Sequence, residues 1–260
     1  MIDYKDFAID LAKKAGSVIK TNFALGMEKE WKEDETPLTL TDKAVNQMVL
    51  DAVKNTYPDH GVIAEEGSDY NGQEYAWVCD PIDGTIPFSH GMPTCAFMLA
   101  LTRNGKSILG VIYDPFMDNL YFAEEGKGAY LNGKRIHVSK TETLSNACVA
   151  LIIWKRNPFY RTELINEILD TGIYDFNVNS TGYMDGLVAN GEFAAVLCSS
   201  IYPWDTAAPK IIIEEAGGKV TDFFGNEPDF RGKVEGHLAT NGILHDKFVA
   251  IFKRHIVNDK

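Results

Sequence analysis

The sequence predicts a layered α+β fold built from several short strands and helices. Two helical patterns come first, and they are followed by a run of apolar segments with the length of strands. Strands that succeed one another without a helix between them argue against the βαβ alternation of a Rossmann fold. No linker rich in Pro, Gly or Ser interrupts the chain. We therefore expect one domain over 1–260, with two intimate lobes at about 1–145 and 146–260.

The first lobe is predicted to begin with two amphipathic helices. One covers about the first 20 residues, where apolar side chains recur at helical spacing, and the other spans Asp42 to Thr56. Between them, EKEWKEDETPLTLTD is polar and interrupted by Pro37, which is typical of a loop or an edge hairpin. Apolar runs then predict strands, and Asn132-Gly133 predicts a hairpin turn within GAYLNGKRIHVS. The predicted strands are 61–64, 77–79, 95–102, 107–114 and 120–125.

The second lobe mixes strands and helices. CVALIIW (148–154) and FAAVLC (193–198) have the composition of buried strands, and KVTD (219–222) is a third candidate. Helices are predicted near 164–169, near 182–189 and from about Thr206 to Ala216. Gly217-Gly218 is the expected stop of the last of these helices, because glycine is favoured just beyond a helix C-terminus.

Charge and cysteine content exclude several classes of function. The net charge of −12 argues against nucleic acid or an anionic membrane as a partner, because both bind basic surfaces. The four cysteines are scattered and form no C-x-x-C pair, which indicates buried thiols in a reducing compartment. The charged N-terminus lacks the apolar core of a signal peptide, and no apolar run approaches the ~20 residues of a membrane span. We expect a soluble, cytoplasmic protein.

Two aspartates follow the apolar segment in WVCDPIDGT. Pro81 favours an extended Asp80, and the bend after it can return Asp83 toward Asp80. Carboxylates held close together repel unless one is protonated or a cation lies between them. The following Gly84-Thr85 turn offers N–H donors and a hydroxyl to an anion. Oxygen ligands without His or Cys suit Mg²⁺, which commonly binds substrate phosphate as well. The alternative is an Asx-turn closed by Asp83.

Other acids also lie at the ends of regular elements. Glu65-Glu66 follows the strand GVIA, and Asp205 precedes the predicted helix TAAPKIII. Taken singly, the glutamates are typical of solvated surface and Asp205 of a helix N-cap. Together with the pair after WVC, they predict a convergence of carboxylates where strand ends meet. A bound cation and phosphate would explain that convergence in an acidic chain.

Competing motifs fail on spacing. Haloacid dehalogenases require D-x-D-G-T, but Pro81 stands where the nucleophilic aspartate would be, and an EF-hand loop starting at Asp80 would have Ile82 and Gly84 at ligand positions. The chain has no G-x-G-x-x-G, Walker A or G-x-S-x-G motif. The six histidines form no H-x-x-x-H pair, so they are not expected to bind a metal.

WVCDPIDGT (77–85) and WDTAAPKIIIEEAGG (204–218) closely resemble the two signatures of the inositol monophosphatase family, the lithium-sensitive Mg²⁺-dependent phosphatases. IAEE, TLTD, GVIYDP and GKGAYLNGKRIHVS match further family features in the same order, so the resemblance covers nearly the whole chain. It implies an α-β-α-β-α sandwich, a homodimer, and direct in-line hydrolysis of a small phosphate ester with two to three Mg²⁺ ions per site.

The resemblance also assigns roles to residues. It implies metal ligands at Glu65, Asp80, Asp83 and Asp205, with the Ile82 carbonyl as a further ligand. It implies a phosphate cradle at Gly84 and Thr85, and it makes Asp42, Thr85 and Glu65 the catalytic set, with Asp42 and Thr85 orienting the attacking water. For Asp42, the alternative role is that of a helix cap. Asp83 and Asp205 would also accept hydrogen bonds from substrate hydroxyls.

Two positions depart from the family pattern. Pro87 stands where many members have Asn, and Cys198 stands where members that favour inositol have a Glu that binds ring hydroxyls. A thiol is a weak hydrogen-bonding group and does not replace a carboxylate. Ser180, Thr181 or Asp185 would supply replacement contacts, because that segment borders the substrate in the family; alternatively, Asp185 is a solvated helix residue.

The substrate is expected to be inositol monophosphate or a related sugar or polyol phosphate. Fructose-1,6-bisphosphate, histidinol phosphate and a 3′-phosphonucleotide are the alternatives within the superfamily. A non-catalytic regulatory member that keeps the metal fold for structure is an alternative of a different class.

Overall fold

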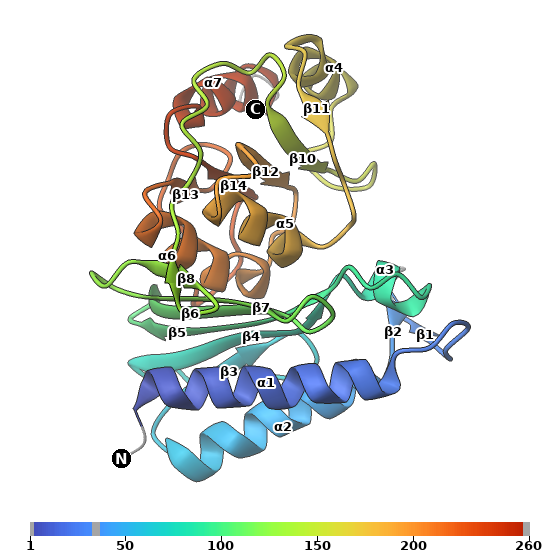
Figure 1. Cartoon of the computed structure of the whole chain (residues 1–260), viewed down its shortest axis with the longest axis vertical. Helices are drawn as coiled ribbons and strands as arrows, with labels where there is room; N and C mark the ends of the chain where they lie inside the picture. The colour runs from blue at the N-terminus through green and yellow to red at the C-terminus, as the bar shows by residue number, and fades with distance from the viewer. Residues whose placement is uncertain (1–2, 33–36, 257–260) are drawn as a thin grey trace.

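The computed structural model of the chain describes residues 3–32 and 37–256, and it arranges them in five layers (Figure 1). Two helices cover the outer face of a seven-stranded sheet, two lie between that sheet and a five-stranded one, and two cover the far side. In layer order the helix pairs are α1 (Tyr4–Asn22) and α2 (Leu40–Thr56), α5 (Thr181–Ala189) and α6 (Ala207–Glu215), and α4 (Thr162–Asp170) and α7 (His245–Ile256). The α-β-α-β-α sandwich is confirmed.

The seven-stranded sheet follows chain order from β3 to β9, with β3 parallel to β4 and every later pair antiparallel. Its turn at Asn132-Gly133 has positive φ at both residues, as the predicted hairpin requires. The strands are β3 (Gly61–Ala64), β4 (Tyr75–Asp83), β5 (Ala96–Arg103), β6 (Lys106–Asp114), β7 (Asn119–Glu124), β8 (Ala129–Leu131) and β9 (Lys134–Arg135).

Strand β4 is longer than the sequence pattern predicts. It continues through Pro81 to Asp83, and its register against β5 shifts between Asp80 and Asp83. Proline cannot donate to a strand ladder, so an irregularity at this point is expected. Gly84 follows in the left-handed region with φ of 85°, and the short helix α3 (Thr85–Ser89) begins directly after it. The two aspartates are therefore placed at the very end of a central strand.

The polar segment between α1 and α2 forms a small hairpin at its ends. Strand β1 (Glu30–Trp31) pairs antiparallel with β2 (Pro37–Leu38), in agreement with the edge-hairpin alternative, and residues 33–36 lie outside the described residues. Helix α2 begins at Leu40, two residues before the predicted start. Thr39 and Asp42 form a capping box there, in which each side chain accepts from the backbone N–H of the other residue.

The five-stranded sheet has the order β11-β10-β12-β14-β13. Strand β14 lies beyond the last element that the sequence pattern predicts, and it runs antiparallel between β12 and β13, with His237 directly opposite Cys198. The strands are β10 (Cys148–Ile152), β11 (Tyr174–Asp175), β12 (Ala195–Cys198), β13 (Lys219–Thr221) and β14 (His237–Thr240). The turn η1 (Pro203–Asp205) connects β12 to α6.

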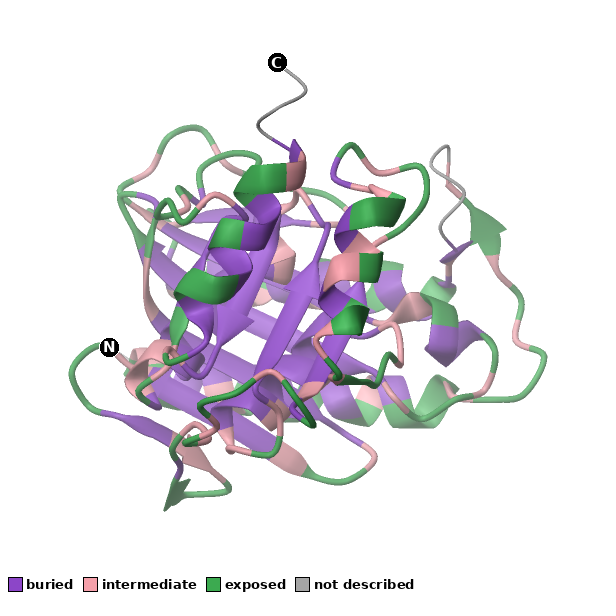
Figure 2. Ribbon diagram, turned by 90° about the horizontal axis from the view of Figure 1, so that it is seen from above, coloured by how far each residue is buried: buried purple, intermediate pink, exposed green. Residues whose placement is uncertain are grey.

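Apolar side chains fill the spaces between the layers. Three clusters of buried residues occupy the interfaces of the sheets with α1 and α2, with α5 and α6, and with α4 and α7. Figure 2 shows the central strands of both large sheets as buried, whereas the edge strands β9 and β11 are exposed; the helices nearest the viewer are buried on one side only. No helix among the described residues has the length and apolar content needed to cross a membrane.

Candidate functional site

Three carboxylates meet where the two halves of the chain come together. Asp80 and Asp83 end β4, whereas Asp205 ends η1, which contacts β4. Each of the three offers a carboxylate oxygen, and these oxygens all lie within 4.8 Å of one another. The structure therefore brings together aspartates that are distant in sequence, and the resulting donor set consists of oxygen alone.

Burial makes this cluster electrostatically unfavourable when it is charged. It raises the pKa of Asp80 and of Asp205 well above the ordinary value, and the charges of neighbouring carboxylates add to the effect. Burial also raises the pKa of Asp83, but hydrogen bonds from Ser180, Thr181 and Gly182 oppose the rise and leave it at about 6. A cation bound among the carboxylates would offset the cost of burying their charge and would reduce their mutual repulsion.

Asp83 is held by the start of α5. Its Oδ2 accepts from the Ser180 hydroxyl and from Gly182 N–H at 2.9 Å, and its Oδ1 accepts from Thr181 N–H at 2.8 Å. The Asx-turn at this corner is closed by the other aspartate, because Ile82 N–H donates to Asp80 Oδ1 at 3.0 Å. Asp83 is thus oriented by a different element of the fold.

Asp205 is not bonded as an ordinary N-cap. Its Oδ2 accepts a hydrogen bond from the Ser200 hydroxyl, and α6 begins after Thr206 without a side-chain cap. Sequence reasoning missed Ser200, because the sequence gives no signal that it folds back on Asp205.

Glu65 follows β3, beside the end of β4, and already contacts a cation. Lys32 Nζ lies 2.7 Å from Glu65 Oε1 and also forms an ion pair with Glu66. Burial lowers the pKa of Lys32, but the charges and hydrogen bonds of both glutamates outweigh it and raise that pKa. For Glu65, burial dominates, so its pKa rises to about 7 despite Lys32. Glu65 is not part of the group of three aspartates whose oxygens lie within 4.8 Å of one another, but it lies close enough for its charge to raise the pKa of Asp80.

Asp42 and Thr85 connect α2 to the turn after β4. Asp42 Oδ2 accepts from Thr39 N–H at 2.9 Å, and Asp42 Oδ1 lies 3.2 Å from Thr85 Oγ1. The same hydroxyl lies 2.9 Å from the Ile82 carbonyl oxygen, so these three expected site residues are contiguous. Asp42 is fully buried, and burial raises its pKa. The helix cap and the contact with Thr85 use different oxygens of one carboxylate.

Gly84 permits a close approach of α5 to the turn. A Cβ at this position would lie 2.8 Å from Ser180 Cβ and 3.0 Å from the Thr94 carbonyl oxygen, and the φ of 85° disfavours other residues. Pro87 is buried in α3, where the first turn needs no intrahelical N–H donor. The departure at Pro87 is therefore compatible with the local backbone.

The remaining expected substrate residues lie behind the carboxylates. Ser180, Thr181 and Cys198 are buried, and Thr181 Oγ1 lies 3.3 Å from Cys198 Sγ. Asp185 has no exposed surface and faces His237, so the alternative of a solvated helix residue is wrong for it. Sequence patterns predicted no helix or strand around His237, so its contact with Asp185 was not expected.

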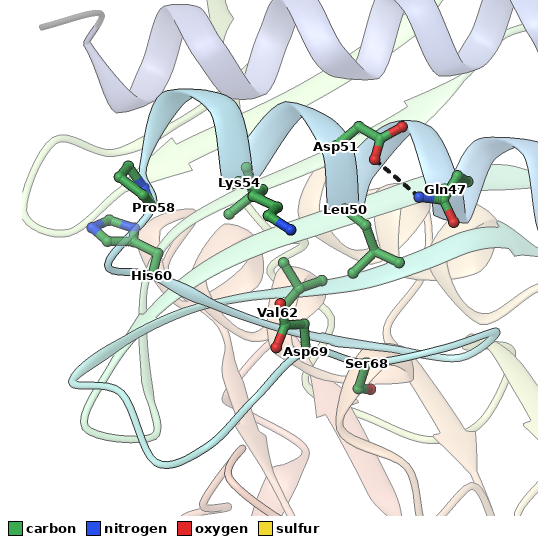
Figure 3. A pocket seen from close by; sticks show the side chains of 10 residues that line it. Gln47, Leu50, Asp51, Lys54, Pro58, His60, Val62, Ser68 and Asp69 are labelled. Atoms are coloured by element: carbon green, nitrogen blue, oxygen red, sulfur yellow. Dashed lines mark hydrogen bonds between the residues drawn. The ribbon is translucent and has the colours of Figure 1, made fainter.

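A separate hollow of about 210 Å³ lies between α2 and the chain near β3 (Figure 3). His60 and Lys54 are among its lining side chains, but none of the cluster carboxylates lines it. It is therefore distinct from the site described above.

Comparison with known proteins agrees with this geometry. The model of the inositol monophosphatase family matches residues 3–257. The fructose-1,6-bisphosphatase/inositol-1-monophosphatase of Thermotoga maritima is 33% identical over 255 residues, covering 96% of both chains. The Nus factor SuhB of Salmonella typhimurium is 34% identical over 225 residues, covering 84% of each.

Solved structures give the same result. An IMPase of Thermotoga maritima superimposes with a TM-score of 0.88 at 32% identity, covering 99% of each chain. The family model extends over nearly all of the chain and includes every carboxylate of the site. The chain belongs to the inositol monophosphatase family.

Proposed function

We propose that the protein is a Mg²⁺-dependent phosphomonoesterase that hydrolyses inositol monophosphate or a related sugar or polyol phosphate. The observation that carries this proposal is the all-oxygen cluster of Asp80, Asp83 and Asp205, whose ligand atoms lie within 4.8 Å of one another. Oxygen donors of this kind suit a hard divalent cation. The proposal includes two to three Mg²⁺ ions per site, a cytoplasmic location and a homodimer, as the family resemblance implies.

The proposed ligands are the three aspartates, Glu65 and the Ile82 carbonyl. When bound, Mg²⁺ supplies a Lewis acid that activates water and neutralises charge on phosphate and on the leaving alkoxide. The three aspartates fit this role, because their carboxylate oxygens lie within 4.8 Å of one another, and Glu65 lies beside them. Ser180 and Ser200 fix the carboxylates of Asp83 and Asp205 in place.

Asp42 and Thr85 are proposed to position the attacking water. The Thr85 hydroxyl lies between Asp42 Oδ1 and the Ile82 carbonyl oxygen, so it is oriented before substrate arrives. Asp42 would receive the proton that water releases through Thr85, a form of general-base assistance. The Gly84-Thr85 turn would bind phosphate oxygens through its backbone N–H groups.

The substrate contacts favour broad use of alcohol phosphates. Asp83 and Asp205 offer carboxylate oxygens to substrate hydroxyls, whereas Cys198 offers only a buried thiol. Selectivity for a hydroxyl depends on a paired polar group in the site, so preference for inositol should be weak. Fructose-1,6-bisphosphate, histidinol phosphate and a 3′-phosphonucleotide are the competing substrates, and the Thermotoga maritima relative bears both fructose-bisphosphatase and inositol-phosphatase names.

A regulatory role is the second candidate, because the chain is also similar to the Nus factor SuhB. A protein that only used the fold for binding would have no need for Asp42, Thr85 and the aspartate cluster in one contiguous set. These residues are present together here, which supports catalysis.

Purified protein assayed for phosphate release from a panel of esters tests the proposal. The panel contains inositol 1-phosphate, glycerol 2-phosphate, fructose 1,6-bisphosphate, histidinol phosphate and a 3′-phosphonucleotide, each with Mg²⁺ and with EDTA. We expect turnover of several polyol phosphates with Mg²⁺ alone. Absence of turnover on every ester in Mg²⁺ would favour the regulatory role, whereas strict use of one of the last three would overturn the assigned substrate class.

A further inference from the structure

Helix α5 connects the candidate metal site to the five-stranded sheet. Its first turn binds the Asp83 carboxylate through the Ser180 hydroxyl and the N–H groups of Thr181 and Gly182. Ser180 is the N-cap residue of α5, but its side chain makes no capping hydrogen bond to the helix. The polar groups at this helix end are therefore directed at Asp83, and the position of α5 determines where they lie.

The same helix is fixed to the sheet by two buried polar pairs. Thr181 and Asp185 are four residues apart on α5 and so share one face. Across from them, Cys198 and His237 are register partners on β12 and β14. Thr181 Oγ1 lies 3.3 Å from Cys198 Sγ, and His237 Nε2 lies 2.9 and 3.1 Å from the two carboxylate oxygens of Asp185.

These pairs lie within an otherwise apolar layer. Asp185 and His237 have no exposed surface, and the buried residues around them are mainly Ala, Val, Ile and Met. Burying such a pair contributes little stability compared with apolar residues of the same size, whereas its directional contact fixes one relative placement of the two elements. The pair is therefore better suited to fixing the position of α5 against the sheet than to stabilising the fold.

We propose that Asp185 and His237 form a positioning pair that sets the placement of α5 and, through it, the geometry of the metal ligand Asp83. The inference rests on the proposed function, because it takes Asp83 as a metal ligand. Neither residue touches the reacting atoms. Direct hydrogen-bond partners of metal ligands, here Ser180, Thr181 and Gly182 on Asp83, typically affect metal affinity by about 10- to 100-fold, and the pair acts through their placement.

The space around α5 makes Asp83 sensitive to its placement. A Cβ on Gly182 would lie 2.4 Å from Met98 Sδ, and a Cβ on Gly84 would lie 2.8 Å from Ser180 Cβ. The helix is therefore packed tightly against β5 and against the turn after β4. If α5 shifted away from β14, the three groups that donate hydrogen bonds to Asp83 would therefore move with it.

The test measures Mg²⁺ affinity by isothermal titration calorimetry, with thermal unfolding in EDTA as a separate readout of stability. His237→Leu removes the partner of Asp185, and His237→Gln retains a side-chain donor. We expect the Mg²⁺ affinity of His237→Leu to be lower than that of the wild type by about 10-fold or more. His237→Gln should recover most of that loss. If His237→Leu does not fold, Asp185→Leu provides the same comparison, because it removes the oxygens that His237 Nε2 contacts.

Thr221→Val is the matched control. It removes the hydroxyl 2.9 Å from His245 Nε2, another buried polar contact, which joins β13 to α7 on the far side of the sheet. We expect lowered stability and unchanged Mg²⁺ affinity in this variant. The double variant Asp185→Leu/His237→Leu restores apolar packing without the directional contact, so it should fold but bind Mg²⁺ weakly.

Two results would overturn the positioning role. One is wild-type Mg²⁺ affinity in His237→Leu or in the double leucine variant, and the other is an equal loss of affinity in Thr221→Val. Asp83→Asn separates this failure from failure of the proposed function. If Asp83→Asn binds Mg²⁺ as wild type does, Asp83 is not a ligand and both proposals fail; if only Asp83→Asn loses affinity, the pair alone is excluded.

Discussion

The hydroxyl oxygen of Thr85 lies 3.2 Å from Asp42 Oδ1, and this contact joins the turn after β4 to the first turn of α2. Asp42 uses its other oxygen to accept from Thr39 N–H in the capping box of α2. A residue that the sequence offers either as a helix cap or as a catalytic group therefore makes both contacts. Substitutions can separate the two roles, because each role uses its own oxygen.

Thr85→Ala and Asp42→Asn should lower kcat by about 10²- to 10⁴-fold while changing Mg²⁺ affinity much less. Both side chains are proposed to position the water and accept its proton, and neither is a proposed metal ligand. Thr39→Ala is the comparison, since it removes the capping hydroxyl, which also donates to Asp42 Oδ2, and leaves the contact of Asp42 Oδ1 with Thr85, at a cost of about 1 kcal/mol in the free energy of unfolding. If Asp42→Asn showed normal kcat and only a lowered Tm, the cap alone would explain the residue.

Excess LiCl should inhibit hydrolysis in the presence of Mg²⁺, whereas KCl at the same ionic strength should not. The family resemblance implies that Li⁺ occupies one of the metal positions, and the chain retains Asp80, Asp83 and Asp205 there. The segment EKEWKEDETP is expected to tune this sensitivity; its residues 33–36 lie outside the described residues. Identical rates in the two salts would count against the assigned metal positions.

In EDTA, Asp83→Asn should gain stability relative to the wild type as pH rises. Burial raises the pKa of Asp83 to about 6, so the folded wild type binds more protons than the unfolded chain between about pH 4 and pH 6. Its free energy of unfolding therefore falls over that window, and the Asn variant lacks this term.

The difference in the free energy of unfolding between Asp83→Asn and the wild type should change by up to about 3 kcal/mol between about pH 4 and pH 6 and then stay constant. Urea unfolding at pH 4.5 and pH 7.5 measures it. Asp222→Asn, a buried aspartate in the chain after β13, serves as the control. A pH-independent difference would mean that Asp83 has an ordinary pKa in the folded protein.

Cys198→Glu should raise the preference for inositol 1-phosphate over glycerol 2-phosphate, measured as the ratio of kcat/KM values. A carboxylate accepts hydrogen bonds from ring hydroxyls that a thiol binds weakly. Cys198→Ser is the control, because it changes the Thr181 contact without adding a carboxylate. A wild type that already discriminates between these esters by a thousandfold or more would contradict this role of Cys198.

Local sequence patterns predicted the elements that carry the site. Apolar periodicity placed α2 and the strand ahead of Asp80, and Pro81 with Gly84 marked the corner at its end. Periodicity did not indicate that β4 continues through Pro81, because proline normally ends a strand ladder. The residues from Pro81 to Asp83 belong to the strand only because they pair irregularly with β5.

Contacts between distant segments could not be predicted in the same way. Lys32 lies in a polar stretch whose pattern is typical of solvent exposure, yet its ammonium pairs with Glu65 and Glu66. The pair of Asp185 and His237 depends on β14 entering the sheet beside β12, and β14 has only Leu238 and Ala239 as apolar residues, which is too weak a pattern to predict a strand. Such contacts follow from tertiary packing, which propensity does not encode.

The central claim is that the carboxylate cluster holds the Mg²⁺ that hydrolysis needs. Its most direct test is phosphate release from inositol 1-phosphate by protein stripped with EDTA, before and after excess Mg²⁺ is added, for the wild type and for Asp205→Asn of unchanged Tm. We predict no turnover in EDTA, full recovery of the wild type with Mg²⁺, and almost none in Asp205→Asn. Full turnover of the stripped wild type in EDTA would contradict the claim.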